Sequence, residues 1–154
     1  MSMLTRYRKP GGFAQLVLLI EGCNQKKQKQ LMDLILVEDK SWHQKIQDNI
    51  LTREKLLALP PELTNEIFSR VPDKVLSFIL HSLTPEQREK ATATLTHFKK
   101  KALEELMGGA APSVGDIEAA FMHVFKKVRD LEKDGTISFL KLAPALSLSE
   151  DKAA

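Results

Sequence analysis

Several residue types are scarce in this sequence, and each shortage excludes a class of protein. Cys23 is the one cysteine among the 154 residues, so no disulfide can form within the chain and no thiolate cluster can hold a metal. The chain also has one Trp and one Tyr, and both lie far from most of the lysine runs. Nucleic-acid-binding proteins usually place such aromatics beside a basic face. We therefore expect a reducing, cytoplasmic compartment and no nucleic-acid partner.

Long apolar runs are missing as well. The longest near the N-terminus covers residues 16–20 and is followed by Glu21. A transmembrane helix needs about 20 apolar residues, and no secretory signal pattern precedes this run. We expect no direct insertion into a membrane. With 43 % hydrophobic residues, the chain can still build a core of its own.

No pattern typical of catalysis, of a metal site or of a cofactor site is present. The glycine pairs Gly11-Gly12 and Gly108-Gly109 lack the spacing of a phosphate-binding loop, and no histidine has a partner at HExxH spacing. The acidic pairs Glu38-Asp39 and Glu104-Glu105 are typical of exposed helix surfaces, whereas acid–base catalysis needs carboxyls in contrasting environments. We expect no enzyme activity, no metal and no cofactor.

What the sequence has in abundance is helix-forming residues and helix-start signals. Gly11-Gly12 ends a loose basic N-terminus, and three helices are expected after it, over about 13–22, 25–37 and 41–51. Asn24 is a candidate N-cap for the second helix, and Asp39 or Ser41 for the third. The first helix carries an apolar stripe and further leucines on its reverse side, so we expect much of it to be buried.

A repeated signal occupies the middle of the chain. An apolar residue followed by a helix-starting Pro or Thr recurs every 12 residues, at Leu59-Pro60, Val71-Pro72, Leu83-Thr84 and Leu95-Thr96. Thr84 begins a capping-box pattern. Each step is long enough for one short helix with one apolar side. Such helices must stack on one another to close a core, in a superhelix that is right-handed or of mixed hand.

A long amphipathic helix is expected after Gly108-Gly109, and Asp134-Gly135 ends it. The residues that follow have few core-forming signals. We therefore divide the chain into a flexible basic N-terminus (1–10), a first helical part (11–51), a connecting segment (52–60), a C-terminal helical part (61–141) containing a charged helix (96–107) and the long helix (114–133), and a disordered tail (142–154).

The charged helix at 96–107 has the most distinctive chemistry. Helical spacing places Phe98, Ala102 and Leu106 in one row, which we expect to be buried. On the other sides, Lys100 precedes Glu104 and Lys101 precedes Glu105 by four residues, so weak intrahelical ion pairs are expected. This helix is either a solvated surface with such pairs or a charged ridge on which another protein docks. The candidate ridge consists of Lys99, Lys100, Lys101, Glu104, Glu105 and, by the resemblance described next, His81.

Residues 11–140 resemble the C-terminal half of the flagellar motor switch protein family FliG. Gly11-Gly12 and the apolar helix after it resemble that family's linker, and 25–51 resembles its armadillo-like subdomain. Arg88-Glu89-Lys90 matches a family triplet, and 117–137 is similar to the family's final long helix and closing turn. The expected fold is thus all-α, with short helices stacked in an armadillo/HEAT-like, right-handed superhelix.

The resemblance implies a non-enzymatic protein-interaction module. The helix at 96–107 would face the cytoplasmic loop of the stator, and other surfaces would bind the switch-ring proteins, so that the chain transmits torque and sets rotation direction. It would lie in the cytoplasm, peripheral to the inner membrane in the flagellar basal body. Self-association through stacked helices is a further expectation.

Several positions depart from the family pattern. His81 stands where the family has a lysine before the capping turn, and Phe98 stands where it has an arginine early in the charged helix. The family's hinge motif falls on 50–53, which does not match it. These changes favour a second hypothesis, a FliG-like paralogue that acts as a scaffold or adaptor outside the motor. A third, a regulatory domain like the cytosolic N-domain of magnesium transporters, shares the short helices, but no acidic ion-binding cluster supports it.

Overall fold

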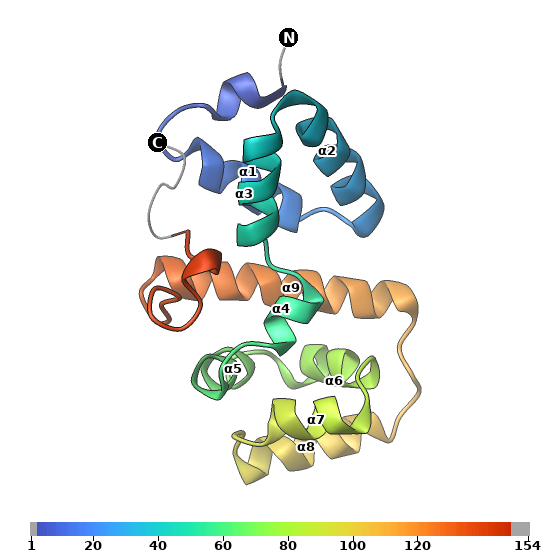
Figure 1. The fold of residues 1–154 in the computed structure, drawn as a ribbon. Coiled ribbons are helices and arrows are strands. Elements are labelled where there is room, and N and C mark those ends of the chain that lie inside the picture. Colours follow the sequence, from blue (N-terminus) through green and yellow to red (C-terminus); the bar gives the residue numbers. More distant parts are fainter. Residues whose placement is uncertain (1–2, 149–154) are drawn as a thin grey trace. The chain divides into compact units, whose positions relative to one another are not determined.

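The computed structural model describes residues 3–148, and within that range every regular element is a helix. The prediction of an all-α fold of stacked helices is therefore confirmed (Figure 1). In chain order the elements are η1 (Met3–Tyr7), α1 (Gly12–Glu21), α2 (Gln25–Glu38), α3 (Lys40–Asn49), α4 (Arg53–Leu57), α5 (Pro61–Phe68), α6 (Asp73–His81), α7 (Pro85–Thr92), α8 (His97–Met107), α9 (Val114–Lys133) and η2 (Pro144–Leu146).

The chain forms two compact units. Within the described residues, the first comprises 3–51 together with 138–148, and the second comprises Thr52–Ile137. The chain thus leaves the first unit after α3 and returns to it after α9. None of the helices in residues 3–148 is long and apolar enough to cross a membrane.

The core of the first unit is built from one side of each of its helices. The ring of Phe13 packs edge-on against that of Trp42, with centroids 5.5 Å apart. Gly12 allows η1 to lie close to α1, because a Cβ at residue 12 would stand 2.0 Å from the carbonyl oxygen of Tyr7. The buried members of this core are Leu4, Phe13, Leu16, Val17, Ile20, Ile35, Trp42, Ile46 and Ile50.

The caps expected in this unit are present. The side chain of Asn24 accepts a hydrogen bond from the backbone N–H of Lys27, and Asp39, rather than Ser41, caps α3 by accepting one from the N–H of Trp42. Much of α1 is buried, as predicted, with six of its ten residues in that class, but Leu18 and Leu19 on its reverse side are nearly half exposed. The packing of α1 uses one stripe only.

Both ends of the described chain differ from the flexible segments that the sequence predicted. Residues 3–7 form a 3-10 helix whose Leu4 is buried. Residues 142–148 contain η2, which packs on α3: the side-chain amide of Asn49 donates to the carbonyl oxygens of Ala145 and Ser147, and Leu146 is buried. Local sequence gave no sign of the ordered C-terminal segment, because its partner Asn49 lies 96 residues from Ala145 and 98 residues from Ser147. Residues 149–154, the rest of the predicted tail, lie outside the described residues.

The second unit contains the four short helices expected from the 12-residue spacing, α5 to α8. The apolar residues that precede the helix starts, Leu59, Val71, Leu83 and Leu95, are all buried. The predicted capping box is present at the start of α7, where Thr84 and Gln87 exchange side chain-to-backbone hydrogen bonds. The structure adds one element to the predicted connecting segment 52–60, the short helix α4.

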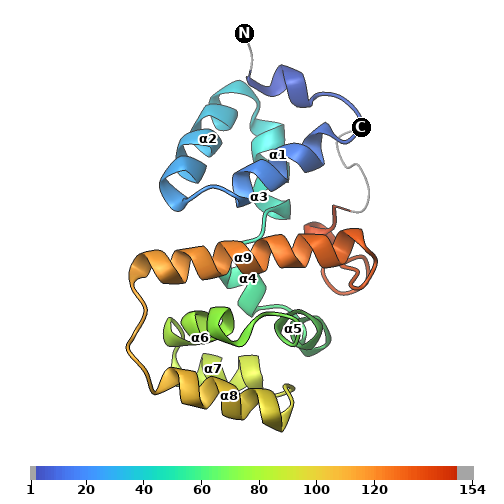
Figure 2. The ribbon, with the colours of Figure 1, turned by 180° about the vertical axis from the view of Figure 1, so that it is seen from behind.

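Helix α6 is the centre of the second unit. It packs against α8 on one side and α9 on the other, and α5 also contacts α9 (Figures 1 and 2). The long helix α9 has the predicted bounds, with a capping box between Ser113 and Asp116. It ends at Lys133 with Asp134 as its C-cap, and Gly135 then takes a positive φ of 84°, a conformation that favours glycine. Because α8 packs on α6 through the side of Leu103, one of its faces is buried and the opposite face is exposed.

Candidate partner-binding surface on helix α8

Helix α8 is defined by local signals at both ends. The hydroxyl of Thr96 accepts a hydrogen bond from the N–H of Lys99, and the helix ends at Met107 before Gly108-Gly109. Leu103, with 2 % of its side chain exposed, is its one buried residue and faces the rest of the unit. The opposite face consists of residues that contact no neighbouring helix through a described hydrogen bond or ion pair.

Lys99, the first residue of the predicted ridge, is a structural residue. Its ammonium donates to the carbonyl oxygen of Val71 at 2.7 Å and to the carboxylate of Asp73 at 2.8 Å, and 15 % of its side chain is exposed. Because Asp73 begins α6, this contact ties the start of α8 to the start of α6. The Lys99 ammonium is therefore committed within the unit and is not presented to a partner.

Lys100 is also turned partly inward. Its ammonium donates to the carbonyl oxygen of Ala93 at 3.3 Å, and its side chain shares a small pocket with Arg88 and Glu104. The side chain of Lys100 is therefore only partly exposed to solvent.

Lys101, Glu104 and Glu105 form the exposed part of the ridge. The predicted ion pairs from Lys100 to Glu104 and from Lys101 to Glu105 do not form in the part of the chain that the structure describes. Lys101 and Glu105 therefore leave one positive and one negative charge without a partner on the outer face of α8.

The prediction that Phe98, Ala102 and Leu106 form a buried row is wrong. Phe98 is 84 % exposed and Leu106 is 40 % exposed. Leu103, which the sequence analysis did not assign to the core, faces the unit instead, and the ammonium of Lys99 reaches toward α6 on the same side of the helix. The row with Phe98 therefore lies outside.

His81, the remaining predicted site residue, is the last residue of α6 and is half buried. It makes no described hydrogen bond or ion pair with the residues of α8. The structure therefore does not join it to the exposed charges of α8 through any direct polar contact.

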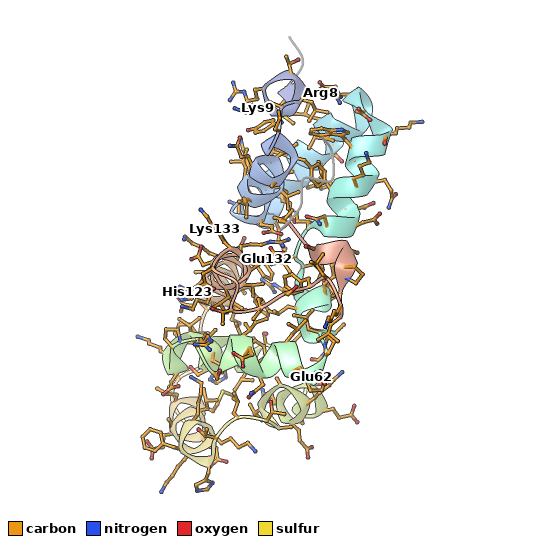
Figure 3. The ribbon with its side chains drawn as sticks, turned by 90° about the vertical axis from the view of Figure 1, so that its left-hand side faces the viewer. Arg8, Lys9, Glu62, His123, Glu132 and Lys133 are labelled. Carbon is orange, nitrogen blue, oxygen red and sulfur yellow. The ribbon has the colours of Figure 1, made fainter. Side chains whose placement is uncertain are left out.

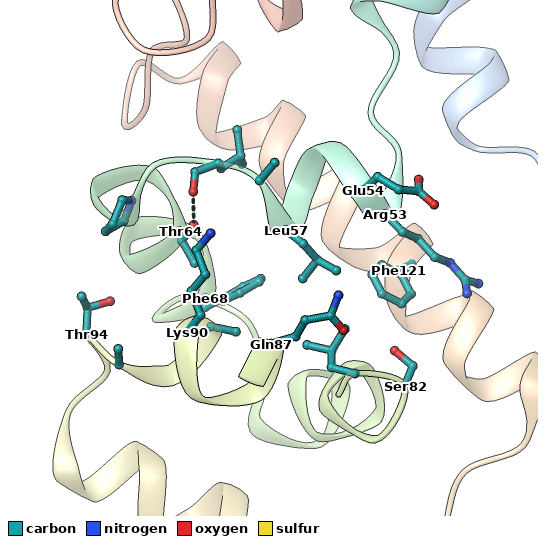
Figure 4. A pocket seen from close by; sticks show the side chains of 16 residues that line it. Arg53, Glu54, Leu57, Thr64, Phe68, Ser82, Gln87, Lys90, Thr94 and Phe121 are labelled. Carbon is teal, nitrogen blue, oxygen red and sulfur yellow. Dashed lines mark hydrogen bonds between the residues drawn. The ribbon is translucent and has the colours of Figure 1, made fainter. Parts of the chain in front are cut away.

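A groove of about 630 Å³ in the second unit was not expected from the sequence (Figure 4). Its lining comes from α4, α5, α7 and α9 and includes Phe68, Gln87 and Lys90. The guanidinium of Arg53 stacks on the ring of Phe121, with 4.5 Å between the guanidinium carbon and the ring centroid. Sequence analysis had no means of finding it, because the residues are brought together only by the packing of α4 on this unit.

Titratable groups elsewhere are explained by local structure. In the first unit the Arg8 guanidinium (Figure 3) bonds Asp39 at 2.7 Å and lies over the Trp42 ring. This hydrogen bond, helped by the one from the Trp42 N–H, holds the pKa of Asp39 below its usual range. In the second unit a hydrogen bond from the Thr136 hydroxyl lowers the pKa of Asp134 in the turn after α9. Both carboxyls have structural roles.

The long helix α9 carries a buried ion pair and an exposed histidine. Arg129 and Glu132 form a buried ion pair at 3.0 Å within α9, and His123 lies on the exposed side of the same helix (Figure 3). Across residues 3–148, no group of three or more His, Cys, Asp or Glu side chains is placed to hold a metal ion. The outer face of α8 and the groove are the surfaces of the second unit that are described above as candidates for binding.

Comparison with known protein families covers the part of the chain that contains α8. The family model described as the FliG C-terminal domain matches residues 33–139, which is more than two thirds of the chain. The chain belongs to the FliG C-terminal domain family. The match begins within α2 and includes α8 and the whole second unit. A comparison with curated protein sequences finds no match.

Membership of the FliG C-terminal domain family assigns the general role of the fold. The family is one of structural and interaction domains rather than enzymes, and it indicates a module of the flagellar motor switch type. The resemblance found in the sequence is thereby confirmed. Phe98 and His81, two of the positions at which the sequence analysis expects a departure from the family pattern, are exposed and half buried respectively.

Proposed function

We propose that this chain is a rotor-switch module that binds other motor proteins on the cytoplasmic side of the membrane. In this proposal the outer face of α8 docks on the cytoplasmic loop of the stator, and other surfaces bind the switch-ring proteins. The module thereby transmits torque and sets rotation direction. The observation that carries the proposal is the family match together with the free charges of Lys101, Glu104 and Glu105 on the outer face of α8.

The physical basis of docking is electrostatic. Lys101 and Glu105 are exposed and have no described partner within the chain. Both side chains are therefore available to form ion pairs with a facing surface. Exposed charges attract an oppositely charged partner over about one Debye length, roughly 8–10 Å at physiological ionic strength. Binding through this face should accordingly weaken as salt is added. Lys99 contributes to the site indirectly, by fixing the rotation of α8.

A second function, an adaptor or scaffold outside the motor, is favoured by one specific observation. Phe98 is 84 % exposed at the position where the family pattern has an arginine. An exposed aromatic side chain beside charges is typical of a hydrophobic anchor in a protein interface. A partner that buries this ring would differ in chemistry from a purely charged stator loop.

The two functions are distinguished in cells. We would delete the gene in its source organism and score flagellar filaments and swimming. Absent filaments or paralysed ones support the motor function. Normal filaments with normal swimming would refute it and leave the adaptor function, whose partner would then be sought by pull-down from cell extract.

The role of the α8 face is tested by a matched pair of substitutions. Glu105→Lys reverses a charge on the outer face of α8, whereas Glu89→Lys makes the same change on the exposed side of α7. Introduced at the chromosomal locus, the first should impair swimming and the second should leave it unchanged, with both proteins at normal abundance and normal helicity. Equal swimming of the two strains would refute the assignment of the α8 face.

A further inference from the structure

The outer face of α8 has an order of residues that is complementary to itself. Phe98, Ala102 and Leu106 are spaced by four residues and form one row along the helix, in which Phe98 and Leu106 are exposed and Ala102 is half buried. Lys101 and Glu105, also four residues apart, form an adjacent row of exposed charges. Apolar and charged rows thus run side by side over the same two turns.

The two rows have nearly the same midpoint. Phe98 and Leu106 are centred on residue 102, and Lys101 and Glu105 are centred on residue 103. With the axis at residue 102, Lys101 faces position 103 of the second copy, so Glu105 lies two residues further along, about 3 Å of rise, a distance that a lysine side chain spans. A two-fold axis at this point exchanges Phe98 with Leu106 and, in the same operation, brings Lys101 within reach of Glu105.

We propose that α8 pairs antiparallel with α8 of a second copy of this chain. In this arrangement the ring of Phe98 packs on Leu106 of the second copy, and the reverse contact occurs at the other end. Ala102 lies at the axis, where its small side chain lets the two helices approach. Along one edge Lys101 pairs with Glu105 of the second copy, twice, because a two-fold axis keeps like edges on the same side.

The charges favour a second copy over a partner of uniform charge. A wholly acidic surface would be attracted by Lys101 and repelled by Glu105, and a wholly basic surface would meet the opposite conflict. The second copy satisfies both side chains at once, and neither has a described ion pair within its own chain to give up. The same contact removes the exposed ring of Phe98 from water.

The expected dimer is weak. A contact confined to one 11-residue helix buries less than the roughly 800 Å² per partner of a standard stable interface. Association should therefore be reversible and should appear only at high protein concentration. This inference does not depend on the proposed function, but the two are linked, because a second copy and a motor protein would compete for the same face of α8.

The test is sedimentation velocity of the purified chain from low micromolar to millimolar concentration. Wild type should form a reversible dimer. Lys101→Glu leaves two acidic side chains in the charged row, and Glu105→Lys leaves two basic ones, so each variant alone should dimerise on the order of tenfold more weakly. An equimolar mixture of the two variants should regain the association, because each lysine then faces a glutamate.

Further variants locate the contact. Phe98→Ser should abolish the dimer with the helix content of wild type by circular dichroism, and Glu89→Lys on α7 should leave the dimer unchanged. Four results would overturn the proposal: a monomeric wild type at millimolar concentration, wild-type association of either charge variant alone, no gain on mixing them, or a dimer that survives Phe98→Ser. The last would place self-association elsewhere, for example on the exposed leucines of α1. All readouts use purified protein, so their outcome is separate from that of the swimming assay.

Discussion

Two substitutions in α8 provide the strongest test of how this helix is oriented. Phe98→Ala removes a larger side chain than Leu103→Ala, yet the structure predicts that the smaller change is the more costly. Phe98 is 84 % exposed and Leu103 is 2 % exposed. Both substitutions lie in the same helix and introduce the same residue, so differences in helix propensity account for at most about 0.7 kcal/mol, and a larger difference reflects burial.

The expected magnitudes follow from that difference. Leu103→Ala removes buried methyl groups and leaves a cavity, which costs about 2–5 kcal/mol in the free energy of unfolding. Phe98→Ala removes almost no buried surface, because the ring is already exposed to solvent. Alanine is also the better helix former by up to about 0.7 kcal/mol. We therefore expect a change between zero and a slight gain. A buried Phe98 would instead cost about 3–5 kcal/mol on truncation.

The measurement is chemical denaturation followed by circular dichroism at 222 nm, at a protein concentration low enough to keep the chain monomeric. Leu103 belongs to the second unit, so the transition that shifts in Leu103→Ala reports on the stability of that unit. A loss of more than about 1 kcal/mol for Phe98→Ala, or equal losses for the two variants, would refute the orientation of α8. It would also remove the basis of the antiparallel pairing.

Two other predictions concern structural contacts. The pKa of Asp39 is lowered in the folded protein, so the contact that it makes with Arg8 stabilises the fold above its unfolded pKa and is lost as the pH falls through the lower, folded value. Asp39→Asn keeps the N-cap but should abolish the part of the acid-induced change in Trp42 fluorescence that this contact causes; an unchanged acid titration would contradict it. Lys99→Met should cost about 1–3 kcal/mol in urea denaturation, because it removes two hydrogen bonds from an ammonium, whereas Lys101→Met should stay within about 0.5 kcal/mol; equal effects of the two would contradict the structural role of Lys99.

Helix existence and most helix boundaries were accessible from the sequence, because the signals that set them are local. The capping box at Thr84, the N-cap at Asn24 and the break at Asp134-Gly135 each act within one turn of the chain. The 12-residue spacing likewise predicted four short helices, and the apolar residue before each helix start is buried. The family resemblance used the same colinear signals.

The candidate site was only partly accessible. Composition identified the charged helix, but its rotation depends on where the ammonium of Lys99 finds its acceptors. Those acceptors, Val71 and Asp73, lie 28 and 26 residues earlier in the chain. The sequence analysis placed the row of Phe98 in the core, whereas the structure buries Leu103. Of the three lysines in the predicted ridge, Lys101 is exposed, whereas Lys99 and Lys100 are partly buried; the binding role of the ridge stays a prediction.

The sequence by itself determined that this chain is a stack of short capped helices of the FliG C-terminal type, because caps, breaks and apolar spacing are properties of neighbouring residues. Only the tertiary structure decided which face of α8 is free, that 138–148 returns to pack on the first unit, and that Arg53 meets Phe121 at the groove. Each of these depends on contacts between residues far apart in the chain. Such contacts are selected by the packing of whole helices, and no local pattern specifies them.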